Sequence, residues 1–184
     1  IDPAHEPSLR SQLFISEQAA KWDKAADYGQ RLVQALDGDA RYDVALALGK
    51  LAKDKLSDAY MSIDAFLAAH RIKPEALEVL DALYILYRET KQGAKAAEML
   101  EKMLSEPNLR AEPNKAKRVY FALGEINRDE LMDLEKAEHS FNKALDVDFR
   151  FIEAFSAREA MLGQAKQWKK LDENYKRMIQ RLPK

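Results

Sequence analysis

The segment AKRVYFALGEINRDELMDLEKAEHSFNKALDVDF, residues 116–149, contains two runs of small and apolar residues at helical spacing, joined by a short polar stretch. Gly124 in the first run and Ala137 in the second leave space for two helices to approach closely. Tyr120 and Phe141 are large enough to fill the gaps beside them. The segment therefore predicts a helical hairpin. Because one hairpin cannot bury both of its apolar faces, we expect copies on either side.

Copies of this pattern occur elsewhere in the chain. The sequence that begins at Gly49 aligns without a gap with the sequence that begins at Gly124. The identical pairs are Gly49 and Gly124, Asp54 and Asp129, Leu56 and Leu131, Asp58 and Asp133, Phe66 and Phe141, and Ala69 and Ala144. A second alignment relates the two ends of the chain and matches Trp22 with Trp168. Residues 82–104 supply a further hairpin, so we expect about five in all.

This pattern resembles the tetratricopeptide repeat, a helix–turn–helix unit of about 34 residues with the same alternation of small and large side chains. The resemblance covers nearly the whole chain. It implies an all-α fold, an α-solenoid of about five helix–turn–helix repeats stacked into a right-handed superhelix. We expect residues 1–184 to form a single domain of this kind, as a piece of a longer, bacterial-type repeat protein. The proline that usually closes the unit is present as Pro74 but is replaced by Phe149 in the best copy.

Local features give sharper expectations. The Gly49 and Gly124 copies carry extra turn residues before their second helices, so their first helices are expected to be longer than usual. Pro74 is expected in the first turn of a helix, where its missing N–H is not needed. Ser105–Asn114 is expected to be a loop inside the array, because it contains two prolines. The last helix is expected to pack through an apolar stripe formed by Trp168, Leu171, Tyr175, Met178 and Leu182.

Composition narrows the possible functions. The 184 residues are 47% hydrophobic and 33% charged, which is enough to bury a continuous core and to solvate two long faces. The formal net charge of −1 gives no basic footprint for nucleic acid. The absence of cysteine excludes disulfides and thiol chemistry. No apolar run is long enough to cross a bilayer, so we expect no membrane insertion and a cytoplasmic location.

Residues that carry catalysis or bind metal ions are sparse. His5, His70 and His139 have no histidine or cysteine at the spacing of a metal site and are expected at the surface. No serine lies in a nucleophile elbow, and no glycine-rich run is suited to holding a phosphate. Met99 and Met103 are expected in the core. We predict that the protein is not an enzyme and binds no cofactor and no metal.

The resemblance also implies where a partner binds. In this family the first helices of successive repeats line a concave groove that holds partner segments. The positions in this chain that match the groove are Arg10, Phe14, Glu17, Leu46, Lys50, Lys53, Asp54, Asp81, Ile85, Arg88, Arg118, Phe121, Glu125, Arg128 and Asp129. Among them, Phe121 is expected to anchor an apolar side chain and Arg128 to bind a carboxylate. The alternative is that the apolar members pack against adjacent helices and the charged members are solvated.

Some members of the family bind the carboxylate tails of chaperones through a clamp of lysines, asparagines and an arginine on these helices. The matching positions here are Arg10, Phe14, Ala47, Glu78 and Ala82 in one register, and Leu46, Lys50, Ala82, Arg118 and Ala122 in another. Neither register supplies the asparagines, so we do not expect a chaperone-tail adaptor. We predict a non-catalytic scaffold that binds a partner peptide or helix in the groove. The alternatives are a structural or self-associating spacer in a longer solenoid and a recruiting domain attached to an enzyme.

Overall fold

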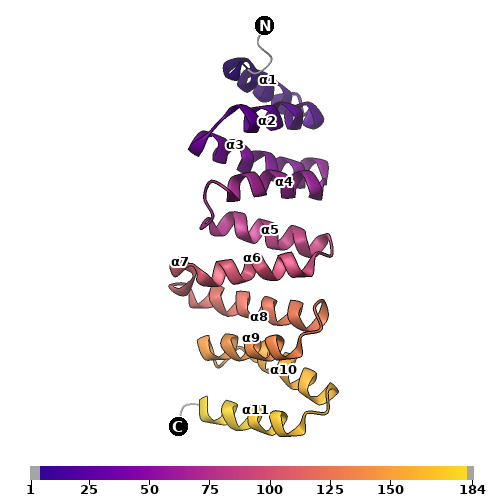
Figure 1. Ribbon diagram of the computed structural model, residues 1–184, viewed down its shortest axis with the longest axis vertical. Coiled ribbons are helices and arrows are strands. Elements are labelled where there is room, and N and C mark those ends of the chain that lie inside the picture. Colours follow the sequence, from indigo (N-terminus) through magenta and orange to yellow (C-terminus); the bar gives the residue numbers. More distant parts are fainter. Residues whose placement is uncertain (1–4, 182–184) are drawn as a thin grey trace. The chain divides into compact units, whose positions relative to one another are not determined.

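The computed structural model describes residues 5–181, apart from the side chain of Arg110. Over that range the chain contains eleven α-helices, one short π-helix and no strand (Figure 1), which confirms the all-α class. No helix in the same range is both long and apolar enough to span a bilayer. The helices form two compact units, Ile1–Gln92 and Gly93–Lys184. That both units belong to a single domain stays a prediction.

The first unit contains two complete helical hairpins and the first helix of a third. Its elements are α1 (Glu6–Gln18), α2 (Trp22–Ala35), α3 (Gly38–Leu51), the π-helix η1 (Ala52–Leu56), α4 (Ala59–His70) and α5 (Leu77–Glu89). Each helix packs on the next one along the chain: α1 on α2, α2 on α3, α3 on α4, and α4 on α5. The largest fully buried side chains of this unit are those of Leu32, Phe66, Leu80, Leu83 and Leu86. They come from second and first helices alike, as expected for stacked hairpins.

The second unit begins with the second helix of the third hairpin, which is followed by two complete hairpins. Its elements are α6 (Gly93–Ser105), α7 (Pro107–Arg110), α8 (Pro113–Asp129), α9 (Leu134–Val147), α10 (Ile152–Gln164) and α11 (Trp168–Arg181). α6 packs on α8, α8 on α9, α9 on α10, and α10 on α11. Met99 and Met103 of α6 are buried, as predicted.

The five turns between first and second helices share one backbone feature. Each contains a non-glycine residue in the left-handed conformation, and these residues are Ala20, Ser57, Lys91, Met132 and Lys166. Ser57 and Lys91 are 34 residues apart, and so are Met132 and Lys166, which matches the repeat length inferred from the sequence. After Ala20, Lys91 and Lys166 the chain makes the paired hydrogen bonds of a Schellman motif. The other two turns are longer.

Those two longer turns belong to the Gly49 and Gly124 copies. The first helix of one copy is α3, which continues into η1, and that of the other is the 17-residue α8, so the predicted lengthening is confirmed. The side chain of Asp58 accepts a hydrogen bond from the Met61 N–H at 2.9 Å, and Asp133 accepts one from the Lys136 N–H at 3.0 Å. Both aspartates are therefore N-caps that fix the start of the second helix.

The predicted close contacts between the helices of these hairpins are present. A Cβ atom on Gly124 would lie 2.5 Å from Cε1 of Phe141, and one on Gly49 would lie 2.8 Å from Cε1 of Phe66. Such distances are far below ordinary van der Waals contact, so each glycine allows a phenylalanine ring to lie against the helix backbone. The alignment of the two copies therefore matches equivalent contacts.

Two proline-based expectations were wrong. Ser105–Asn114 is not a continuous loop, because it contains α7 and the start of α8, and Pro107 and Pro113 lie at the beginnings of these helices. Proline suits the first turn of a helix, where its N–H would have no partner. Pro74 is not in the first turn of α5, which begins three residues later at Leu77.

The last helix packs through only part of its predicted apolar stripe, because Leu171 and Met178 are half-buried, with Leu171 against core residues of α9 and α10. Trp168 and Tyr175 of α11 are 63% and 42% exposed, whereas Asn174 is buried. Leu182 lies outside the described residues. α11 therefore turns a partly polar face toward α10.

That polar face belongs to a buried network centred on Arg158 of α10, whose side chain is 1% exposed. Arg158 Nη1 donates a hydrogen bond to Asn174 Oδ1 at 2.6 Å, and its Nη2 donates to Glu138 Oε1 at 2.6 Å. Lys170 of α11 donates to the other oxygen of Glu138 at 2.9 Å. Burial raises the pKa of Glu138, but the hydrogen bonds from Arg158 and Lys170 outweigh it and hold the pKa below its ordinary value. The network thus joins α9, α10 and α11.

Candidate functional site

The predicted groove residues of the first unit differ in how free they are to bind a partner. Phe14 of α1 is 61% exposed, while Leu46 of α3 and Ile85 of α5 are half-buried. Lys50 of α3 forms an ion pair with Glu78 of α5 at 2.5 Å. This pair links the first helices of two successive hairpins, so Lys50 already has an anionic partner.

The remaining predicted residue of this unit, Arg88 of α5, is also engaged. Its Nη1 donates a hydrogen bond to the Tyr84 hydroxyl at 3.2 Å, one helical turn earlier. Tyr84 is half-buried, which places the guanidinium along the surface of its own helix.

In the second unit, Phe121 of α8 is half-buried and packs against two other rings. Its ring centroid lies 5.7 Å from that of Phe141 and 5.3 Å from that of Phe151. Phe121 therefore fills the seam between α8, α9 and the start of α10. The structure favours the alternative reading of Phe121 as a packing residue over its predicted role as an open anchor.

Loss of the Phe121 side chain is expected to lower stability. Phe121→Ala should reduce the free energy of unfolding by about 1–2 kcal/mol, less than a fully buried phenylalanine because the ring is half-buried. A thermal or denaturant melt of the variant measures this loss. An unchanged melt would mean that the ring contributes little to the seam and is free to serve as an anchor.

Arg128 lies at the end of α8, and its guanidinium is already engaged by its neighbour. Nε donates to Asp129 Oδ1 at 2.6 Å and Nη2 donates to Asp129 Oδ2 at 2.7 Å. The hydrogen bonds that Arg128 donates to Asp129 raise the pKa of Arg128 above its ordinary value. The bidentate geometry predicted for a partner carboxylate is thus used within the chain. Glu125 is half-buried, and Arg118 is exposed near the start of the same helix.

Arg128 and Asp129 border a wide hollow of about 690 Å³ between the turn after α8 and the end of α10. Its other lining residues are Met132, Leu134, Ala160, Met161, Gln164 and Ala165. Because both charged groups on this rim are paired with each other, the hollow offers no unpaired charge from them.

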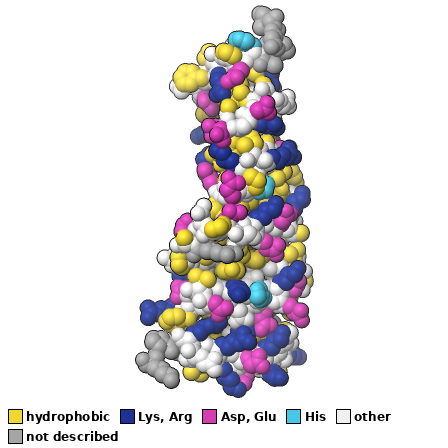
Figure 2. All heavy atoms as spheres, turned by 60° about the vertical axis from the view of Figure 1, so that its left-hand side comes forward, with side chains coloured by type: hydrophobic (Ala, Val, Ile, Leu, Met, Phe, Trp, Pro, Cys, Tyr) yellow, Lys and Arg dark blue, Asp and Glu magenta, His cyan; other side chains and the backbone are white. Residues whose placement is uncertain are grey.

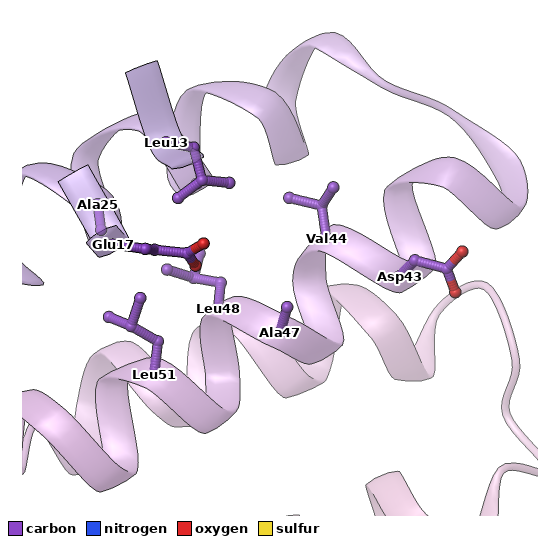
Figure 3. A pocket seen from close by; sticks show the side chains of 9 residues that line it. Leu13, Glu17, Ala25, Asp43, Val44, Ala47, Leu48 and Leu51 are labelled. Atoms are coloured by element: carbon purple, nitrogen blue, oxygen red, sulfur yellow. The ribbon is translucent and has the colours of Figure 1, made fainter. Parts of the chain in front are cut away.

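An apolar cavity lies in the first unit between α1 and α3, where α2 also contributes to its lining (Figure 3). Its volume is about 160 Å³. The lining is mainly aliphatic and consists of Leu13, Glu17, Ala25, Gly29, Asp43, Val44, Ala47, Leu48 and Leu51. The predicted groove residue Glu17 is among them, whereas Phe14, Leu46 and Lys50 are not.

The packing of α2 explains why this cavity exists. α2 packs against both α1 and α3, while α1 and α3, the first helices of successive hairpins, have almost no direct backbone contact. The residues that α2 contributes to the cavity are Ala25 and Gly29, which are buried and small. A Cβ atom on Gly29 would lie 3.1 Å from Leu48 Cδ1, so α2 and α3 approach closely there. The cavity therefore exists because the small residues of α2 fill little of the space between α1 and α3.

The two charged residues of the cavity are both acidic. Figure 3 shows the Glu17 carboxylate between Leu13 and Leu48 at one end of the group of lining side chains, while the Asp43 carboxylate points outward at the other end. Glu17 is half-buried and Asp43 is exposed. Apolar walls with a few polar groups at the edge are typical of a site that binds an apolar group in a fixed orientation.

The side chains that line this cavity are suited to binding an apolar group. Its lining contains no histidine, serine or lysine. Among residues 5–181, no group of histidine, aspartate and glutamate side chains is arranged to hold a metal ion. On the face seen in Figure 2, acidic and basic side chains are intermixed within each unit.

Comparisons with known proteins identify the fold. No family model matches the sequence, and no curated protein matches it. Solved structures do match: a crystal structure of MamA has 14% identity and a TM-score of 0.62, covering 98% of this chain and 94% of that one. MamA from Desulfovibrio magneticus, from residue 41 onward, has 18% identity and a TM-score of 0.58, covering 98% of this chain and 95% of that one. The chain therefore has a helical-repeat fold similar to that of MamA, which supports a fold of the tetratricopeptide type.

Proposed function

We propose that the chain is a non-catalytic protein-interaction module that receives one apolar side chain of a partner segment in the cavity between α1 and α3. The observation that carries this proposal is the cavity itself, an apolar hollow between the first helices of two successive hairpins. In helical-repeat proteins, stacked helices form extended surfaces suited to binding other proteins. The fold similarity to MamA supports a protein-binding role by analogy only.

The size of the cavity favours a side chain over a free small molecule. Pockets for drug-sized ligands usually measure about 300–1,000 Å³, whereas this cavity measures about 160 Å³. That space suits one leucine-sized or phenylalanine-sized group. Anchors of this kind, inserted in a pocket and surrounded by weaker contacts, commonly dominate the affinity of protein interfaces.

The test is a selection of short random peptides on the protein, with Ala47→Arg as the blocked variant. Ala47 is exposed, lies on α3 and lines the cavity, so an arginine there should fill the entrance without disturbing the core. We expect enriched peptides to contain a large apolar residue and to bind Ala47→Arg at least about tenfold more weakly, a difference of about 1.4 kcal/mol.

Ala40→Arg serves as the matched control. Ala40 is also exposed and on α3, but it does not line the cavity. Circular dichroism would establish that both variants keep their helices. Peptides that bind the wild type and Ala47→Arg equally would place the binding surface elsewhere and contradict the proposal.

Self-association is the second candidate, and one observation favours it. Trp168, Tyr175 and Ile179 lie along one face of α11 and are all exposed. Exposed aromatic and aliphatic residues in a row often mark an interaction surface. Light scattering over a range of protein concentrations tests this candidate, because self-association through α11 requires the mass to rise with concentration.

A further inference from the structure

The charge of the cavity between α1 and α3 points to the chemistry of its partner. Of its nine lining residues, Glu17 and Asp43 carry charge, and both are acidic. Within residues 5–181, neither forms an ion pair. The hydrogen bond to Asp39 is the main cause that raises the pKa of Lys73, and the charge of Asp43 makes a smaller contribution.

Three cations on the neighbouring helices have acidic partners of their own: Arg10 pairs with Glu6 at 2.8 Å, Lys50 with Glu78 at 2.5 Å, and Lys73 with Asp39 at 2.9 Å. Among the described residues Glu17 and Asp43 therefore form no ion pair of their own, although the charge of Asp43 acts on Lys73. An acid left unpaired beside a cavity repels negative ligands and attracts positive ones.

We infer that the partner segment is basic, with a lysine or arginine close to the apolar side chain that enters the cavity. This inference rests on the proposed function and adds the charge of the partner to it. The Glu17 carboxylate lies between the lining side chains of Leu13 and Leu48 (Figure 3), where it can accept hydrogen bonds from an ammonium or guanidinium group next to the anchor. Asp43, at the other end, provides a second acceptor for a cation farther along the segment.

The same arrangement selects against acidic segments. A carboxylate that followed the apolar anchor would face Glu17 at one end of the cavity or Asp43 at the other. Apolar walls reduce solvent screening, so both the attraction of cations and the repulsion of anions are stronger than on an open surface. The site therefore discriminates by charge as well as by the shape of the anchor.

Charge inversion tests this inference. The random-peptide selection is repeated on a Glu17→Lys, Asp43→Lys variant, and the charge of those peptides that depend on Ala47 is compared with the wild-type result. We expect the wild type to enrich peptides with lysine or arginine beside the apolar residue, and the inverted variant to enrich aspartate or glutamate there. Raising the salt concentration should weaken binding to both proteins.

Asp64→Lys is the matched control, because Asp64 is exposed in the first unit and does not line the cavity. It should enrich the same basic peptides as the wild type. Neutral or acidic peptides enriched by the wild type in an Ala47-dependent manner would overturn the inference and leave the proposed function intact. If no enriched peptide depends on Ala47, the proposed function itself fails.

Discussion

Replacing Arg158 by leucine is expected to lower the free energy of unfolding by about 3 kcal/mol, because it removes one partner from a buried charged network. The substitution deletes the hydrogen bonds that Arg158 donates to Glu138 and Asn174 at 2.6 Å. Glu138 keeps Lys170, which is why the expected loss is at the lower end for such changes. Leucine itself suits the position, because the equivalent residue of another hairpin is a leucine. Arg158 lies eight residues before the left-handed Lys166, and Leu83 lies eight residues before the left-handed Lys91. The expected loss of stability therefore comes from the polar groups of Glu138 and Asn174 that lose their hydrogen bonds.

A triple apolar variant separates the network from the packing around it. When residues are counted from the left-handed residue of each turn, Glu138 corresponds to Ala97 of α6 and Asn174 corresponds to Met99 of α6. Both Ala97 and Met99 are buried. Glu138→Ala and Asn174→Met, added to Arg158→Leu, should recover most of the lost stability, because removing all partners of a buried network is often neutral or stabilising. Arg158 Nε and Asn174 Nδ2 have no hydrogen-bond partner among the described residues, which strengthens this expectation. Denaturant melts that show the triple variant to be as unstable as Arg158→Leu would contradict it.

Gly124→Leu is expected to destabilise the protein by about 2 kcal/mol. Leaving glycine gains about 1 kcal/mol of helix propensity, but overpacking a closed core typically loses about 1–3 kcal/mol. Here the loss should lie near the top of that range. The new Cβ would lie 2.5 Å from the ring of Phe141, whose side chain is 0% exposed and has little space to move.

Gly163→Leu provides the matched control. Gly163 lies in α10 of the same unit, and no atom would lie within 4 Å of its Cβ. Thermal melts should show this variant unchanged or stabilised by up to about 1 kcal/mol. If Gly124→Leu were as stable as Gly163→Leu, Gly124 would not be a close-contact position and the alignment of the hairpins would be wrong.

The hairpins could be predicted from the sequence because they depend on local spacing. The pairing of glycine with phenylalanine at Gly49 and Gly124 repeats in the sequence and is found in the structure as two equivalent ring-to-backbone contacts. The orientation of α11 could not be predicted in this way. Helical periodicity assigns Trp168 and Tyr175 to the core, but both are exposed, whereas Asn174 is buried and accepts a hydrogen bond from Arg158, and Lys170 pairs with Glu138. Buried charge pairs of this kind are invisible to hydrophobic periodicity.

The candidate site was predicted only in part. The repeat resemblance pointed to the first helices of the hairpins, and the cavity lies between two of them, with the expected groove residue Glu17 in its lining. Phe121 and Arg128 were less informative because each already has partners inside the chain, two rings for Phe121 and the Asp129 carboxylate for Arg128. The cavity depends on a gap between α1 and α3 above the small residues Ala25 and Gly29. A sequence shows that such residues allow close packing, but it does not show which neighbouring helices stand apart.

The most direct test of partner binding in the cavity is an NMR titration of leucine-methyl-labelled protein with the tightest peptide from the selection. Leu13, Leu48 and Leu51 line the cavity, and Leu171 lies on α11 in the second unit. We expect the methyl signals of Leu13, Leu48 and Leu51 to shift and to show intermolecular NOEs to the apolar side chain of the peptide, while Leu171 stays unchanged. A bound peptide that leaves the three cavity leucines unperturbed, or that shows its NOEs to Leu171 instead, would contradict a docking site between α1 and α3.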